Sequence, residues 1–250
     1  AAQMLGAASL TKEQLIELAP LLEQAGPLEL RDLVRPFQRN GSLETRSAFL
    51  VSLEQSRSFL SLPHQVFSDI VKSYQDELRP RANKMLDQLK AKDQQQAQRL
   101  DELLPLLKTG NAERGKVVFE NQKTKCASCH QVNSKGGKIG PDLSNIGANR
   151  QGRDLLESIV LPSASLVRQY EAFSVVTTEG RVLTGLIARE TEEAIYVQQQ
   201  TGDPVMIPRK NIDELVPSTV SIMPNDLDKT LSRQDIADLV AYLKTLRKAR

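Results

Sequence analysis

Two cysteines and a histidine form the most reactive run of the sequence, Cys126-Ala127-Ser128-Cys129-His130. They are the only 2 cysteines among the 250 residues, and the chain has 2 histidines in total. Two thiols at this spacing can form a redox dithiol, contribute half of a zinc site, or attach a haem covalently. The residues around the motif distinguish these three chemistries.

The surrounding pattern disfavours the dithiol and the zinc site. A thioredoxin-type dithiol begins a helix that follows a strand within a βαβ unit, but here a helical pattern precedes the motif. A structural zinc site needs four Cys or His ligands, and the second histidine, His64, lies in the other half of the chain. Haem attachment needs only what is present, because each thiol can bond to one porphyrin vinyl group and His130 then meets the iron. The motif therefore predicts one covalently attached haem c.

The residues on both sides of the motif resemble those of class I cytochrome c. Gly115 and Phe119 match the small and aromatic residues of that family's first helix, and GPDL at 140–143 matches its Gly-Pro-x-Leu segment. Tyr242 fits the aromatic residue at which the family's last helix crosses the first. Met223 stands before that last helix, where the family places a methionine.

The resemblance implies that haem c binds to Cys126, Cys129, His130, Pro141, Leu143 and Met223. His130 and Met223 would be the two iron ligands, and the Pro141 carbonyl would accept a hydrogen bond from His130 and fix its tautomer. His/Met ligation raises the reduction potential, because the soft thioether favours Fe(II). The implied function is one-electron transfer without bond-making at the iron, so we do not expect the chain to be an enzyme.

An inserted β segment, about residues 171–218, departs from ordinary class I domains. With this segment and the stretches GNAERGKVVFENQ, GPDLSNIG and SIMPNDLDKTLSRQDIADLVAYLKTL, residues 109–246 resemble the haem-binding domain near the C-terminus of large secreted proteins of planctomycetes and verrucomicrobia. Such relatives often carry helical repeats before the cytochrome and a β-propeller dehydrogenase-like domain further upstream. The resemblance therefore implies an attached or partner dehydrogenase as the electron donor. Because haem c is attached outside the cytoplasm, we expect a periplasmic or otherwise exported protein.

Periodicity divides the chain into a helical half and a mixed half. Residues 1–108 carry apolar stripes at helical spacing and a capping box at Thr11, and they resemble HEAT-like repeats without a clean period. Residues 109–250 read as the cytochrome c domain, with a last helix capped by Ser232. The fold class is mainly α, with an inserted antiparallel sheet or small barrel. Its strands are expected at 173–178, 182–188, 194–199, 205–207 and 212–216.

Other candidate ligands receive ordinary structural interpretations. Met206 lies in a short apolar strand, and Met4 and Met85 lie in the helical half, so we expect all three to be packed in cores. His64 is expected to be a surface or capping residue. The alternative function is a haem-based small-ligand sensor or enzyme with a labile or vacant sixth site. A protein used mainly for assembly, with the haem a minor passenger, is a third interpretation.

Composition limits the partners. The net charge is +2 and aromatic residues make up 4% of the chain, which disfavours nucleic acid as a partner. No apolar run approaches the roughly 18 residues of a membrane span. Six basic residues and one acid lie between Arg114 and Lys138. They form either a solvated surface or a docking patch for an acidic redox partner.

The start of the chain and its helical half predict how the protein is processed and assembled. The first residues lack an initiator methionine and the pattern of a signal peptide, so we expect a mature form or an excised piece of a longer protein. The helical half has apolar faces that need a partner. A homodimer held mainly by residues before Thr109 is therefore expected.

Overall fold

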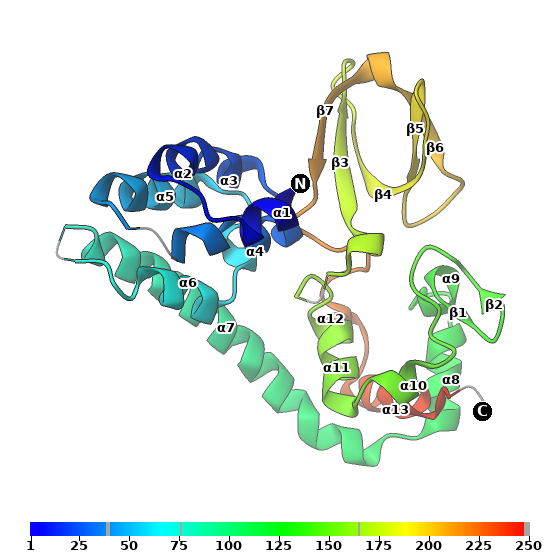
Figure 1. The fold of residues 1–250 in the computed structure, drawn as a ribbon. Helices are drawn as coiled ribbons and strands as arrows, with labels where there is room; N and C mark the ends of the chain where they lie inside the picture. Colours follow the sequence, from blue (N-terminus) through cyan, green and yellow to red (C-terminus); the bar gives the residue numbers. More distant parts are fainter. Residues whose placement is uncertain (39–40, 76, 165, 248–250) are drawn as a thin grey trace. The chain divides into compact units, whose positions relative to one another are not determined.

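The computed structural model describes residues 1–38, 41–75, 77–164 and 166–247, and its contacts divide the chain into two compact units (Figure 1). One unit consists of Ala1–Gln95 and Val216–Thr219, and the other of Gln96–Leu215 and Val220–Arg250. The division falls before residue 109 because Leu100 and Leu103 are buried in the core of the second unit. A domain boundary at residue 109 stays a prediction.

The first unit is an assembly of short helices. Its capping box at Thr11 is present: the Gln14 N–H donates to Thr11 Oγ1 at 3.3 Å, and the Thr11 N–H donates to Gln14 Oε1 at 2.9 Å. Its elements are α1 (Ala2–Ala7), α2 (Lys12–Leu18), α3 (Leu21–Gln24), α4 (Pro27–Leu33), η1 (Arg35–Gln38), α5 (Leu43–Gln55), η2 (Phe59–Ser61), α6 (His64–Val71) and the first part of α7 (Arg79–Leu103). The predicted helical N-terminal region is confirmed.

Several aromatic side chains pack against one another within the largely aliphatic core of the first unit. The ring centroids of Phe37 and Phe49 lie 4.7 Å apart, and those of Phe59 and Phe67 lie 5.8 Å apart in an edge-on arrangement. Such pairs stabilise a core beyond the area that they bury. This unit therefore has its own core.

The second unit contains the two cysteines, which lie on a short helix. Its helical elements are η3 (Leu104–Thr109), α8 (Ala112–Glu120), α9 (Cys126–Cys129), α10 (Ile146–Asn149), α11 (Gly152–Val160), η4 (Arg168–Tyr170), α12 (Leu227–Thr230) and α13 (Arg233–Thr245). A hairpin of β1 (Gln131–Val132) and β2 (Lys135–Gly136) follows α9. The predicted cap of the last helix is confirmed, since the Asp235 N–H donates to Ser232 Oγ at 3.1 Å.

The crossing of α8 and α13 depends on Gly115. A Cβ atom built there would lie 1.9 Å from the backbone oxygen of Asp238, so only glycine lets the two helices approach this closely. The rings of Phe119 and Tyr242 pack at the same crossing, with centroids 5.6 Å apart. The predicted contact between the helix before the motif and the last helix is therefore present.

A five-stranded sheet lies between α11 and α12 in the sequence, and it confirms the predicted strands. The strands are β3 (Ala172–Thr177), β4 (Val182–Glu190), β5 (Ala194–Gln198), β6 (Val205–Pro208) and β7 (Ile212–Pro217), with η5 (Arg209–Asn211) between the last two. Their order is β6-β5-β4-β3-β7, and the first four pair antiparallel. The sheet has a core of its own, formed by Val175, Leu183, Ile195, Val197 and Ile207. Figure 1 shows η5 joining strands at the two ends of this order.

Two expectations about methionines are wrong. Met206 is 55% exposed, because Ile207 takes the inward position on β6 and side chains alternate between the faces of a strand. Met4 is 79% exposed on the short helix α1. Met85 is buried, as expected.

Candidate cofactor site

The motif forms one helical turn after α8. Lys125 takes a left-handed conformation, with φ of 57°, and this ends the preceding loop and starts α9. The His130 N–H then donates to the Cys126 carbonyl at 2.8 Å. A later segment also binds this turn, since the Gly140 N–H donates to the Cys129 carbonyl at 2.8 Å. The two thiols and the imidazole are thus carried on one compact piece of backbone.

The His130 ring is held by the segment at 140–143. Its Nδ1–H donates to the Pro141 carbonyl at 2.9 Å, and the carbonyl can only accept. A Cβ at Gly140 would lie 2.5 Å from His130 Cε1, so glycine makes room for the ring. Nδ1 therefore keeps its proton, and the lone pair is on Nε2, which is free to bind a metal.

Burial shapes the ionisation of all three motif side chains. It lowers the pKa of His130, against the opposing effect of the hydrogen bond to Pro141, and this favours the neutral imidazole that binds metals. Burial raises the pKa values of Cys126 and Cys129. A redox-active dithiol needs the opposite shift, because its thiolate is the reactive species. The electrostatics therefore disfavour the dithiol function.

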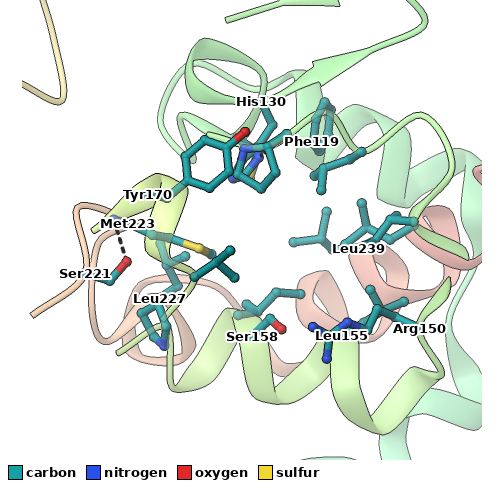
Figure 2. Close-up of a pocket in the computed structure, with 18 of the residues that line it drawn as sticks. Phe119, His130, Arg150, Leu155, Ser158, Tyr170, Ser221, Met223, Leu227 and Leu239 are labelled. Carbon is teal, nitrogen blue, oxygen red and sulfur yellow. Dashed lines mark hydrogen bonds between the residues drawn. The ribbon is translucent and has the colours of Figure 1, made fainter. Parts of the chain in front are cut away.

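An apolar pocket opens beside the motif (Figure 2). It contains about 1090 Å³ of space between protein atoms, its open mouth included. Figure 2 shows His130 and Phe119 entering on one side, Leu155 and Ser158 on the side of α11, and Leu239 on the side of α13. Among the predicted site residues, Cys126, His130, Pro141, Leu143 and Met223 line this pocket. Cys129 lines a smaller neighbouring pocket that Cys126, His130 and Met223 share.

Met223 points its sulfur into the pocket from the loop before α12 (Figure 2). The Met223 N–H donates to Ser221 Oγ at 3.1 Å, and the Ser221 N–H donates to Ser163 Oγ at 3.1 Å. The first bond braces the loop internally, and the second holds it against the segment that follows α11. The structure thus brings Met223 and His130 to one cavity, although they lie 93 positions apart in the sequence.

Arg150 is a pocket residue that the sequence did not single out. Apart from His130, it is the one lining residue with an ionisable basic side chain in the part of the chain that the structure describes. It follows α10, and its place in Figure 2 is near Leu155 and Ser158. No short-range motif marks this arginine, since only the folding of α10 and α11 brings it to the pocket.

The basic residues around the motif are mostly exposed. Five lysines have exposed side chains: Lys116, Lys123, Lys125, Lys135 and Lys138. Arg114 instead binds Asp238, with its Nε–H donating at 2.6 Å and its Nη2–H at 2.8 Å. The lysines therefore leave a positively charged surface near the cysteines.

His64, the other histidine, lies at the start of α6. Its Nδ1 lies 2.7 Å from Asp93 Oδ2, as suits a residue with a structural role at a helix start. Within the described ranges, no group of three or more His, Cys, Asp or Glu side chains is placed to hold a metal ion. No helix in these ranges is long and apolar enough to cross a membrane.

A thiol pair, an adjacent imidazole held by a carbonyl, and an apolar pocket between crossing helices define a c-type cytochrome domain. The comparison with known families agrees: the family model described as Cytochrome c matches residues 112–247. That is more than half of the chain, and the chain belongs to the cytochrome c family. Membership implies covalently bound haem c and haem-based electron transfer with redox partners. The donor set, the room made by Gly140 and the apolar lining fit this group.

Proposed function

We propose that the chain transfers single electrons through one haem c, attached by Cys126 and Cys129 and ligated by His130 and Met223. The observation that carries this proposal is that Cys126, His130 and Met223 line the same apolar pocket. Haem, when bound, supplies an iron that changes between Fe(III) and Fe(II). No group in the pocket has to move a proton for that change, because the residues facing it are largely apolar.

The chain's own residues have three tasks in this proposal. Pro141 keeps His130 in the tautomer that offers Nε2 to the iron. Leu143 and its apolar neighbours exclude water, which disfavours the more highly charged ferric state and raises the potential. Met223 offers a soft thioether, which favours Fe(II) further.

Arg150 has a separate task in the same proposal. Haem carries two carboxylates, and a carboxylate at an apolar pocket needs a cationic partner or water. Arg150 lines the pocket and can donate to such a group with its planar guanidinium.

The setting of this domain is also proposed. The exposed lysines around the motif suit an acidic redox partner, with an attached or separate dehydrogenase as electron donor. Attachment of haem c outside the cytoplasm supports an exported or periplasmic location. We further propose that the helical half is HEAT-like, that it holds the chain as a homodimer, and that the sheet is a small barrel.

Carbon monoxide binding tests the ligation. If Met223 ligates the iron, the ferric protein has the weak far-red band of sulfur-to-iron charge transfer, and the ferrous protein binds carbon monoxide slowly. Replacing Met223 by alanine should remove the band and speed carbon monoxide binding. Rapid binding by the unchanged protein, without the band, would support the small-ligand alternative instead.

A further inference from the structure

The inserted sheet contacts the loop that carries Met223. Gln200 lies in the turn between β5 and β6, and its Nε2–H donates to the Ile222 carbonyl at 2.8 Å. Ile222 directly precedes Met223 in the sequence. The turn itself is braced, because Gln198 Nε2 donates to the carbonyls of Gln199 at 2.8 Å and Gly202 at 3.0 Å. Gln200 thus reaches the loop from a defined turn.

The other side of the loop is held by the segment after α11. Ser163 Oγ accepts the Ser221 N–H at 3.1 Å and donates to Asn225 Oδ1 at 3.2 Å. The loop at 221–225 is therefore fastened on one side by Ser163 and on the other by Gln200. The hydrogen bond from Gln200 exists only because the sheet is inserted in this domain.

A cleft lies between the turn and the loop. On the same measure as the apolar pocket, it contains about 970 Å³ of space between protein atoms, its open mouth included, and its lining includes Gln199, Gln200, Thr201, Ser221, Met223 and Asn225. Because Met223 lines both this cleft and the apolar pocket, a small displacement of the loop would expose its side chain to solvent. The hydrogen bond from Gln200 opposes that displacement.

We propose that the inserted sheet is a clamp on the sixth ligand, with Gln200 as the positioning residue that keeps Met223 in the pocket. This inference rests on the proposed ligation by Met223. Loops open locally with free energies set by the few contacts that hold them. Loss of one neutral hydrogen bond should raise the open population about twofold to tenfold.

The test uses the haem-loaded full chain with three substitutions. Gln200→Ala removes the donor, and Gln200→Glu replaces the donor by a carboxylate that repels the Ile222 carbonyl. Gln199→Ala is the matched control, because Gln199 is a neighbouring glutamine that lines the same cleft. The readouts are the rate of carbon monoxide binding to the ferrous protein and the pH at which the ferric far-red band disappears.

We expect Gln200→Ala to speed carbon monoxide binding about twofold to tenfold and to move loss of the band to lower pH. Gln200→Glu should have a larger effect than Gln200→Ala, and Gln199→Ala should match the unchanged protein. Far-ultraviolet circular dichroism checks that the sheet is retained in each variant.

Two failures are distinguishable. If the unchanged protein lacks the band and Met223→Ala changes nothing, the ligation is wrong and the clamp fails with it. If the band is present and responds to Met223→Ala, but both Gln200 variants behave like Gln199→Ala, only the clamp is overturned.

Discussion

The substitution Gly115→Ala tests the packing of the helices that frame the pocket. Its Cβ would lie 1.9 Å from the Asp238 oxygen and 2.8 Å from Tyr242 Cβ, whereas carbon–oxygen contacts are normally about 3.3 Å or more. The nearest atom is the backbone oxygen of Asp238, which cannot move aside as a side chain can, so α8 and α13 must separate. Overpacking of this kind costs about 1–3 kcal/mol or more, and the clash is severe enough to place it near the top of that range. The higher helix propensity of alanine offsets about 1 kcal/mol of this destabilisation.

We therefore expect Gly115→Ala to destabilise the second unit by about 2 kcal/mol, which corresponds to a fall in Tm of roughly 4–8 °C. The assay is denaturation followed by haem absorbance, since this reports the unit that contains the pocket. Gly152→Ala in α11 is the matched control, because its Cβ would meet Leu107 Cδ1 at 3.5 Å, an ordinary contact. Its stability should stay within about 0.5 kcal/mol of the original. A Gly115→Ala protein as stable as this control would refute the proposed packing.

The remaining predictions concern the ligand, the pH dependence and the assembly. Met223→Ala should lower the reduction potential, measured by redox titration, whereas Met206→Ala on the exposed face of β6 should leave the potential unchanged. The reverse result would show that Met206, and not Met223, is the iron ligand. Burial favours the neutral acid at Asp238, but hydrogen bonds from Arg114, the Asn111 N–H and Gln234 outweigh it and lower the pKa of Asp238. This contribution to stability is therefore present above the unfolded pKa of about 3.9 and lost as the pH falls below it, so Asp238→Asn should flatten the acid limb of a stability–pH profile. Light scattering should find the full chain dimeric and a fragment from Gln96, where the second unit begins, monomeric. A monomeric full chain would end the dimer proposal.

The parts of the site that are local in sequence could be predicted. The spacing of Cys126, Cys129 and His130 predicts covalent haem attachment without a structure, because the three residues lie within five consecutive positions. The strands of the sheet also follow from local alternation of apolar residues, and their bounds agree within two residues. The capping of α13 by Ser232 is equally local.

The remaining features depend on contacts between distant segments. Arg150 reaches the pocket only after α10 and α11 have packed, and Gln200 meets the Ile222 carbonyl across 22 residues. The exposed position of Met206 depends on which face of β6 turns inward, and a four-residue strand gives a weak signal for that choice. Propensity and periodicity carry no information on such pairings.

The most direct test of the central claim is the intact mass of the fully denatured protein, made in a host that attaches haem c and purified after acid-acetone extraction. Attachment through the two cysteines predicts the mass of the polypeptide plus one haem, and loss of that addition when both Cys126 and Cys129 are replaced by alanine. A chain that returns to the bare polypeptide mass after extraction would contradict it, because the haem would then not be attached through the two cysteines.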